Sequence, residues 1–474
     1  MTQLARKLGL LDYFALGCGT IIGVGWLVVM GDWLRRAGPL GAMLGFLIGG
    51  AALLPIGYVY GRLVMLLPDA AGEIAYTAAV FPSTISFATG WMILLPFLIA
   101  CPWFAVAIGK TAAYLFPALN SHEIYRLSGH PVYLPHLLLG LLLTALVTGV
   151  NYRGVRLSAV VQRTATLGLF LLFAVFGSAG VAHGHSANLQ PLFSGSAIVA
   201  VLLMLQIVPY FMTGFECIGK ASEESRVGFA DRDYLVATIL SISVAALFYA
   251  GVIAIVGVAA PWRDTAKQDF ATAAALQAAV GGRTIVNIVL LAALLSLAKA
   301  CNGAFVAATR LLFALGRRGL ATERLSTVHT RNQTPVAAVL LVGGVMAGAM
   351  FLGDTILVPV TEVGSLGSVF AWTMACLAYL FLTTRRRNAR ASVLNSRTER
   401  SIAVAGAVIA GALLVLKLVP AVPGHFTRYE YEALALWLVL GVMVRCTGRR
   451  NIPRTDVAIA TAGCDCRTDV EVRT

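Results

Sequence analysis

A run of glycines interrupts the first strongly apolar stretch of the chain. The nine residues from Gly17 to Gly25 include four glycines, with Thr20, Ile21 and Ile22 between them. Glycine weakens a helix and leaves its backbone polar groups open to other partners. In hydrocarbon an unpaired N–H or C=O is so costly that an opened turn persists only where it lines a cavity or binds something. We therefore expect this segment to bind a ligand through its backbone.

A second interruption follows about 190 residues later in the sequence. Pro209 removes a backbone donor and kinks a helix, and Gly214 loosens the next turn. Glu216 then places a carboxyl group at membrane depth, where such groups are costly and usually functional. Glu216 is accordingly a candidate proton carrier or gate; the alternative is a neutral acid that pins the broken helix. Tyr210 and Phe211, just before the break, are candidates for an aromatic lid or for core packing.

Lys299 is the most distinctive charged residue of the apolar segments. It precedes Arg310 by eleven positions, which is about 16 Å along a helix. If Arg310 marks the cytoplasmic edge, Lys299 lies near the bilayer midplane. A lysine there can stand in for a cation, bind an acidic group of the substrate or pair with Glu216. The alternative is that its side chain snorkels into an outer vestibule.

The two interruptions predict a specific kind of ligand. The N–H groups that begin the outer half of the first helix form a positive dipole end, which suits a carboxylate. The carbonyls that end its inner half, and those around Phe211 to Thr213, suit an ammonium group. A zwitterionic amino acid satisfies both ends, whereas the alternative is that the glycines only allow close helix packing. The candidate binding residues are Gly19, Thr20, Ile21, Ile22, Gly23, Val24, Gly25, Trp26, Tyr210, Phe211, Thr213 and Gly214, and the candidate coupling or gating residues are Glu216 and Lys299.

These residues must be positioned by a membrane-embedded helical protein. The 474 residues are 58% hydrophobic and 12% charged, with a mean hydropathy of +0.82, whereas soluble domains carry about 25% charged residues. Apolar runs long enough to cross the roughly 30 Å hydrocarbon layer recur along the whole chain. We expect an all-α membrane protein of about twelve transmembrane helices, with the runs centred near residues 24, 52, 100, 142, 170, 206, 247, 298, 344, 370, 410 and 438.

The net charge of +14 is a topology signal and does not indicate nucleic-acid binding. With a cytoplasmic amino terminus, the basic residues gather in the inside loops, as the positive-inside rule requires. Both termini are then cytoplasmic, in a plasma membrane that the alanine- and arginine-rich composition suggests is a bacterial inner membrane. The inside set includes Arg6, Lys7, Arg153, Arg226, Arg317, Arg318, Arg324, Arg385, Arg397, Arg400 and Arg445.

The spacing of the breaks, in spans one and six, fits two five-span repeats of inverted topology. We expect a transport core over residues 1–385, two further helices over 386–450 and a disordered cytoplasmic tail over 451–474. The outer connection near 262–283 is apolar enough to form a helix over the outer mouth. We expect no cofactor and no metal site: His183 and His185 form a close pair in an outer loop, and a metal role for Cys464 and Cys466 in the tail is a weak alternative.

Several motifs in this order resemble those of the amino acid–polyamine–organocation (APC) superfamily, whose members have the leucine-transporter-like fold. The resemblance extends over residues 10 to about 385, which makes it specific. It rests on Gly19–Gly25, on Pro68–Tyr76, on Thr213–Glu216 with Glu223 and Glu224, and on Cys301–Arg310 followed by Gly316–Leu320 and Thr334–Pro335.

The chain departs from the family pattern in two places. Trp26 follows the first break, where a smaller or aliphatic residue is usual, and we expect it to narrow the pocket. Proton-coupled members can carry a lysine in the fifth helix that replaces a sodium ion. The stretch from Ser158 to Phe173 offers no lysine at mid-membrane, so that coupling device is not carried over.

The resemblance and the residues together imply a secondary active transporter of amino acids working by alternating access, as a proton-coupled symporter or an exchanger. The alternative within transport is an organic amine or polyamine permease. The acidic side chain of Glu216 suits such a cationic substrate, whereas the positive charge of Lys299 argues against a dicationic one. A membrane enzyme would need a catalytic cluster, and a sensor or partner subunit would need a signalling domain; the sequence shows neither. The expected partners are a small-molecule substrate, a coupling proton and the lipid bilayer, with no nucleic acid.

Overall fold

The fold is described from a computed structural model. It describes residues 8–448 except 24, 155–158, 223–224, 227–228, 269 and 386–395. Val24, the acidic pair Glu223 and Glu224, and the tail over 451–474 with Cys464 and Cys466 therefore lie outside the described residues. So do Arg6, Lys7 and much of the arginine cluster that follows Arg385.

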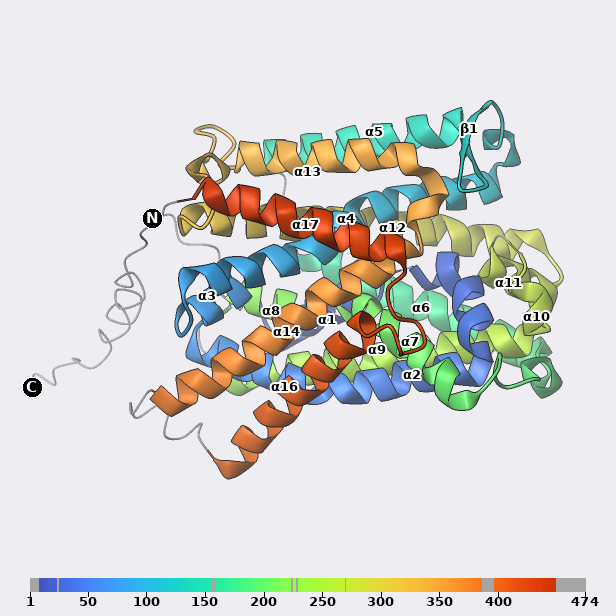
Figure 1. Cartoon of the computed structure of the whole chain (residues 1–474). Helices are drawn as coiled ribbons and strands as arrows, with labels where there is room; N and C mark the ends of the chain where they lie inside the picture. Colours follow the sequence, from blue (N-terminus) through green and yellow to red (C-terminus); the bar gives the residue numbers. More distant parts are fainter. Residues whose placement is uncertain are drawn as a thin grey trace, which may run out of the picture.

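Long helices dominate the described chain (Figure 1). The first half contains α1 (Leu10–Ile21), α2 (Gly25–Leu66), α3 (Glu73–Ala78), α4 (Ser83–Leu115), α5 (Leu134–Arg153), α6 (Ala159–His183), α7 (Ala197–Met212) and α8 (Glu216–Lys220). The second half contains α9 (Asp231–Ala259), α10 (Trp262–Thr265), α11 (Ala271–Val280), α12 (Arg283–Arg317), α13 (Val336–Ala349), α14 (Pro359–Arg385), α16 (Arg397–Leu418) and α17 (Arg428–Cys446).

Among the described residues, nine helices are long and apolar enough to cross a membrane. They are α2, α4, α5, α7 continued by α8, α9, α12, α13, α14 and α16. The 42-residue α2 is too long for one crossing and bends at Gly38, which has a non-helical backbone (φ 69°, ψ 171°) and is followed by Pro39. The α17 helix also forms where an apolar run is predicted, although it is not among the nine.

Helical structure is interrupted at both predicted places. After Ile21 the chain leaves the helix at Ile22 (φ −82°, ψ 82°) and resumes it at Gly25. The second interruption follows Met212: Thr213 is extended, with ψ 135°. Helix returns with Glu216 at the start of α8.

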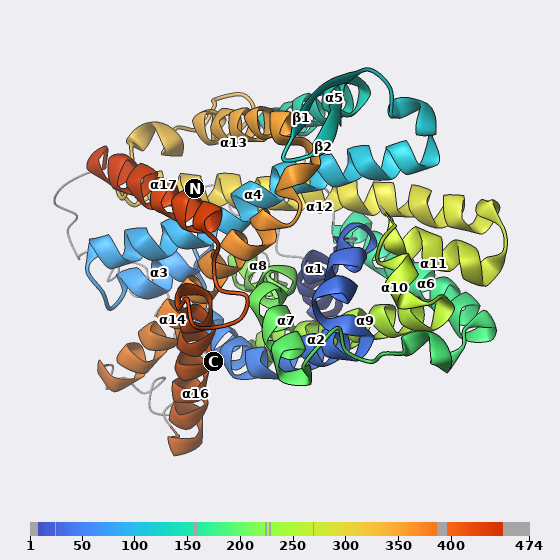
Figure 2. The same ribbon diagram turned by 45° about the vertical axis from the view of Figure 1, so that its right-hand side comes forward.

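Contacts between loops define two ends of the helix bundle (Figures 1 and 2). At one end Arg318 donates to Asp69 at 2.6 Å and Arg445 donates to Ser83 at 3.2 Å. At the other end the indole of Trp262 donates to the carbonyl of Pro191 at 2.9 Å. Loops that follow alternate helices thus meet at the same end, which is the arrangement of a chain that crosses back and forth.

A small β-hairpin stands where the sequence predicts only an outer connection, so the fold is not purely α. The strands β1 (Glu123–Leu127) and β2 (His130–Tyr133) pair antiparallel. The two residues between them, Ser128 and Gly129, both have positive φ, at 49° and 84°. This is the backbone that a two-residue hairpin turn requires. The apolar loop near 262–283, by contrast, forms helices α10 and α11 as predicted.

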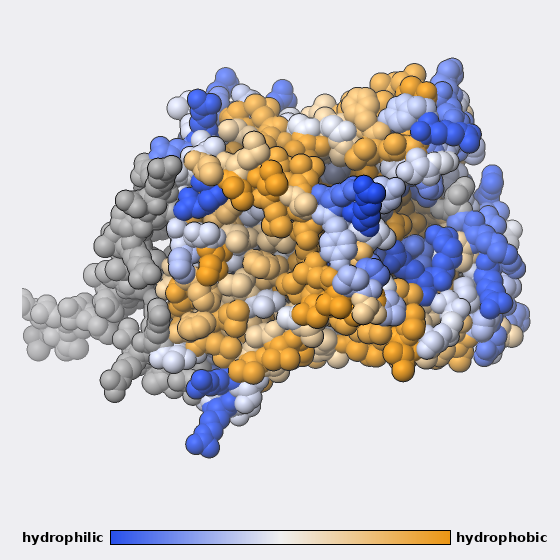
Figure 3. Space-filling view, in the orientation of Figure 1, coloured by the Kyte–Doolittle hydropathy of each residue, from blue (hydrophilic) through white to orange (hydrophobic). Residues whose placement is uncertain are grey.

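Apolar side chains cover much of the outer surface. Figure 3 shows an apolar belt across the middle of one face, with hydrophilic residues gathered at the right-hand end. Leu142 on α5, Val408 on α16 and Val442 on α17 are 57%, 63% and 65% exposed. Such a surface is favourable in contact with lipid and unfavourable in contact with water. A polar functional site is therefore expected in the interior of the bundle.

Candidate functional site

The two interrupted helices meet at one cavity inside the bundle. It encloses about 730 Å³ of empty space, its open mouth included. The break after α1, the end of α7, the middle of α4 and the middle of α12 all contribute to its wall. The lining residues are Gly19, Thr20, Ile21, Gly23, Gly25, Pro96, Phe97, Ala100, Trp103, Phe104, Tyr210, Phe211, Thr213, Tyr249, Lys299, Ala300, Gly303 and Ala304.

The backbones of the two breaks touch each other beside this cavity. Gly214 has φ 143°, and a Cβ added to it would lie 2.7 Å from the nitrogen of Ile21 and 2.9 Å from the carbonyl carbon of Thr20. Only glycine allows this approach, because the obstructing atoms are backbone. The hydroxyl of Tyr249 on α9 donates to the carbonyl of Ile21 at 2.9 Å and lies 3.4 Å from that of Phe211. One tyrosine therefore bridges both opened segments.

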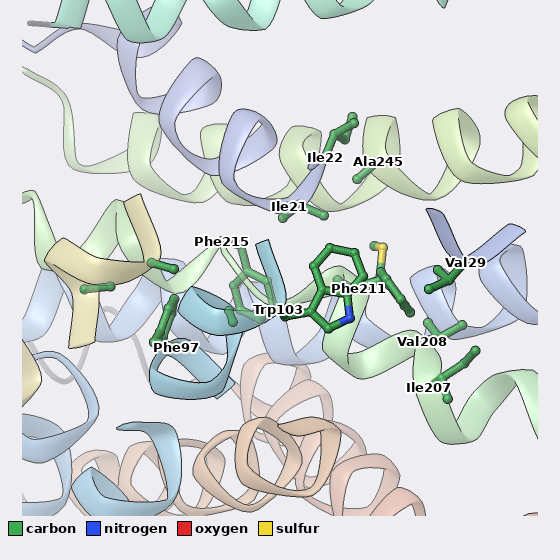
Figure 4. Close-up of a cluster of buried hydrophobic side chains, with 14 of the residues drawn as sticks. Ile21, Ile22, Val29, Phe97, Trp103, Ile207, Val208, Phe211, Phe215 and Ala245 are labelled. Carbon is green, nitrogen blue, oxygen red and sulfur yellow. The ribbon is translucent and has the colours of Figure 1, made fainter. Parts of the chain in front are cut away.

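Aromatic side chains close the cavity near the start of α2. A Cβ added to Gly25 would lie 2.9 Å from the Trp103 ring and 3.3 Å from the Phe211 ring. The Trp103 indole donates to the carbonyl of Leu357 at 2.7 Å, which fixes the ring across the cavity. Figure 4 shows Trp103 and Phe211 together on the side toward which Ile21 points, while Ile22 turns toward Ala245.

The cavity offers few but well-placed polar side chains. The hydroxyl of Thr20 donates to its own helix at Leu16, at 2.6 Å, which leaves its lone pairs for a donor. The hydroxyl of Thr213 lies 2.8 Å from the carbonyl of Pro209 and 2.6 Å from Ser368. The hydroxyl of Tyr210 is buried and has no hydrogen-bond partner among the described residues. An unpartnered buried hydroxyl is costly, so Tyr210 is free to bind a polar group of a ligand.

Lys299 is the one Lys, Arg, Asp or Glu among the residues that line the cavity. No carboxylate of the described chain lies within ion-pair distance of its amine: the ion pairs of the buried interior involve other lysines and arginines. The predicted alternative of a pair with Glu216 is not observed. Lys299 lines the central cavity, as Thr20 does.

Glu216 lies below the cavity and does not line it. Its side chain is 2% exposed, and it accepts a hydrogen bond from the backbone N–H of Gly214 at 2.6 Å. The indole of Trp372 on α14 donates to its other oxygen. Glu216 therefore ties the second break to α14 and is one step removed from a ligand.

A second buried carboxylate and a lysine lie close to Glu216, and sequence reasoning missed both. Lys220 Nζ is 3.4 Å from Glu73 Oε2, with side-chain exposures of 6% and 0%. Tyr60 donates to the other oxygen of Glu73 at 3.2 Å. Lys220 also lies 4.7 Å from the centre of the Phe97 ring, which lines the cavity. Lys220 thus forms an ion pair with Glu73 and acts electrostatically on Glu216 as well.

We predict that this buried ion pair is strongly coupled. Removing one partner should leave an unpaired buried charge, so K220M and E73Q should each destabilise the protein by about 3–5 kcal/mol. The double variant should lose less than the sum of the two, measured by thermal unfolding of the purified protein in detergent. The exposed pair Lys267 and Asp264 is the matched control, for which K267M should cost about 0–1 kcal/mol. Additive losses for the Glu73 and Lys220 variants would contradict the coupling.

A chain of charges on α2, α14 and α16 lies beyond the cavity. Arg36 donates to Asp32 at 2.8 Å and to Glu362 at 2.6 Å. The other oxygen of Glu362 lies 3.6 Å from the fully buried Lys417, whose amine also donates to the carbonyl of Gln206 on α7. This network joins the outer half of the first broken helix to α7, and Glu362 faces it and not the cavity.

Some of the predicted binding residues do not line the cavity. Trp26 does not narrow the cavity: it is fully buried between Phe176 and Phe248, with ring centroids 5.8 and 6.1 Å away. The reason is the helical phase of α2, which directs position 26 away from Gly25. Ile22 packs in the core, and Gly214 supports the break without lining the cavity.

The cavity is also lined by residues that the sequence analysis does not predict. Phe97 and Trp103 come from α4 and Tyr249 comes from α9, both of which read as ordinary apolar spans. The one local sign is that α4 contains Pro96 and Pro102, which are unusual inside a helix. These side chains reach the cavity because helices that are distant in the sequence pack together. The hydrophobic periodicity of the sequence alone therefore does not predict them.

The chain is similar to known membrane permeases along most of its length. A family model described as amino acid permease matches residues 8–444. The chain is 26% identical over 394 residues to the branched-chain amino acid permease BcaP of Bacillus subtilis, covering 81% of this chain and 82% of the relative. It is 25% identical over 451 residues to the methylthioribose transporter of Bacillus subtilis, covering 93% of each. It is 26% identical over 404 residues to cationic amino acid transporter 4 of Mus musculus, covering 80% of this chain and 60% of that longer relative.

The matching family and the relatives are permeases and transporters, so this apolar helical bundle is a multi-pass membrane transporter and not an enzyme. The chain belongs to the amino acid permease family. The resemblance to the APC superfamily seen in the sequence motifs is confirmed.

Proposed function

We propose that this protein moves amino acids across the plasma membrane as a secondary active transporter, by alternating access. The single observation that supports this most is the meeting of both helix breaks at one cavity, with Gly214 against the backbone of Thr20 and Ile21. Broken helices around a central site are the arrangement in which a ligand binds to opened backbone. Movement of one part of the helix bundle against the other about that site then exposes the site to each side of the membrane in turn.

The cavity suits a zwitterion. The N–H groups at the start of α2, from Gly25, form the positive end of a helix dipole and would bind the carboxylate. The carbonyls at the end of α1, with the lone pairs of Thr20 and Thr213, would accept from the ammonium group. The hydroxyl of Tyr210 has no other partner in the described chain and would bind either end.

The same reasoning extends to the topology. We infer twelve crossings, with the first formed by α1 and the outer part of α2, the sixth by α7 and α8, and the last by α17. The first ten, over residues 1–385, form two inverted five-helix repeats, and residues 386–450 add two helices before the tail over 451–474. The first described residues and the end of α17 lie with inside loops: Leu8 accepts from the N–H of Arg226 at 3.1 Å, and Arg445 donates to Ser83. With the positive-inside rule, both termini are cytoplasmic.

A proton is the coupling ion that the buried charges support, in symport or exchange. Glu216, Glu73 and Lys220 form a cluster with one more acid than base. A proton would balance this cluster, and Glu216 connects it to the opened backbone at Gly214. Gain or loss of that proton would change the hydrogen bond between Glu216 at the start of α8 and the backbone of Gly214, and with it the packing of α8 against the cavity.

An amine or polyamine substrate is disfavoured by the same geometry. Such a ligand needs carboxylates in the pocket, whereas the lining residues include Lys299 and no Asp or Glu. The acid that suited this alternative, Glu216, is turned away from the cavity toward Trp372.

Ligand binding tests the proposal directly. A bound substrate at 100 times its Kd should raise the apparent stability by about 2.7 kcal/mol. We expect thermal stabilisation of the purified protein by amino acids bearing a free α-carboxylate and α-amine, and uptake of the same compounds into proteoliposomes. Stabilisation by carboxylate-free amines alone would overturn the proposal.

A further inference from the structure

The charge of the cavity identifies the class of amino acid that it takes. A zwitterion brings one negative and one positive charge, and the opened ends of α1 and α2 match both. Lys299 then remains as the charged side chain among the described lining residues, whose other members are aromatic or aliphatic, or bear a neutral hydroxyl as Thr20, Thr213, Tyr210 and Tyr249 do. An opposite charge stabilises an ammonium group in such surroundings, and the described chain supplies none within ion-pair distance. The ligand is left to supply it.

The vestibule beyond the cavity carries a compatible charge pattern. This second cavity is lined by Asp32, Arg35, Lys110, His130, Lys267 and Asp354, among others. Its two acids are already paired: Asp32 with Arg36 at 2.8 Å and Asp354 with Lys110 at 3.7 Å. Arg35 instead donates to a backbone carbonyl, that of Ala266. Among the described residues along this route, the charged side chains that form no ion pair, Arg35 and Lys299, are both cations.

One hydrogen bond links the lining of the vestibule to the lining of the central cavity. Trp103 lines the central cavity, and its indole donates to the carbonyl of Leu357, which lines the vestibule. Movement of Trp103 away from Leu357 would open a route from Arg35 to Lys299. A positive potential along such a route concentrates anions.

We propose that the substrate is an amino acid with an anionic side chain, such as glutamate or aspartate, whose side-chain carboxylate binds Lys299. This inference rests on the proposed function and narrows it. It sets the chain apart from the three relatives described above, whose names refer to branched-chain amino acids, to methylthioribose and to cationic amino acids.

The test compares ligands that differ only in the charged group. Binding to the purified full-length protein, and uptake into proteoliposomes, are measured for L-glutamate, L-glutamine, L-leucine and L-lysine. A hydrogen bond to a charged group is worth about 1.5–3 kcal/mol, so glutamate should bind about 10- to 100-fold more tightly than glutamine. K299M should remove this difference by weakening glutamate binding more than glutamine binding, and K299R should retain it. R428Q, which removes an exposed cation that lines neither cavity, should leave it unchanged.

Each other outcome has a distinct meaning. If glutamine or leucine binds the wild-type protein as tightly as glutamate, the inference is overturned and the proposed function stands. The inference also fails if K299M weakens all ligands equally, because Lys299 then supports the cavity without selecting the side chain. If no amino acid binds and carboxylate-free amines do, the proposed function falls with it. The wild-type comparison decides even if K299M does not fold.

Discussion

The variant G214A is expected to lose transport and to destabilise the protein. A Cβ at this position would meet the backbone of Ile21 at 2.7 Å and that of Thr20 at 2.9 Å, and no rotamer change relieves a backbone contact. The backbone itself has φ 143°, a conformation that costs a non-glycine residue about 1–3 kcal/mol. Overpacking adds about 1–3 kcal/mol, so we expect a loss of about 2–6 kcal/mol unless the two breaks move apart.

If the breaks do move apart, the cavity changes instead of the stability. Uptake per folded molecule should then fall by at least about tenfold, since 1.4 kcal/mol of lost ligand binding suffices for that. Both quantities are measured on one preparation, by thermal unfolding and by proteoliposome uptake. G344A is the matched control, because a Cβ there meets no atom within 4 Å. Normal stability together with normal uptake in G214A would show that the contact between the breaks is not needed.

The sequence predicts the parts of the site that depend on local backbone chemistry. Glycines at Gly19 to Gly25, and Pro209 with Gly214, disfavour continuous helix wherever the rest of the protein lies. The structure accordingly interrupts helical structure after Ile21 and after Met212. Lys299 is recognisable for the same kind of reason: its charge conflicts with its apolar neighbours in the sequence.

The sequence does not predict contributions that depend on how distant helices pack. Tyr249 reaches the carbonyls of Ile21 and Phe211 only because α9 lies against both breaks. Trp26 follows Gly25 immediately, yet one residue of helix rotates it by about 100°, toward Phe176 and Phe248. Glu73 lies in a stretch that reads as a polar turn, whereas the structure buries it completely. A buried carboxylate of this kind is stabilised by its ion-pair partner, here Lys220, and the sequence does not indicate which residue that partner is.

The variant E216Q is expected to flatten the dependence of transport on pH. In the wild-type protein Glu216 accepts from the N–H of Gly214 and from the indole of Trp372, and both donors suit a carboxylate. Glutamine offers one acceptor and one amide donor, so one of these N–H groups loses its partner, at about 1–3 kcal/mol. More important, the side chain can no longer gain or lose a proton. Uptake should fall, and the remaining uptake should vary little across the range in which the wild-type rate changes.

The groups that face Glu216 decide how this experiment is controlled. Lys220, Glu73 and Trp372 act on it from α8, α3 and α14, so variants of those residues would change the same titration. E399Q is the better control: Glu399 is also a buried carboxylate, paired with Arg62 at the far end of α2. The pH profile of E399Q should follow the wild type, whatever its effect on stability. An E216Q protein that keeps the wild-type profile would exclude Glu216 as the proton carrier. Among the buried charged residues that the structure describes next to the second helix break, Glu73 and Lys220 would then remain as the candidate carriers of a coupling proton.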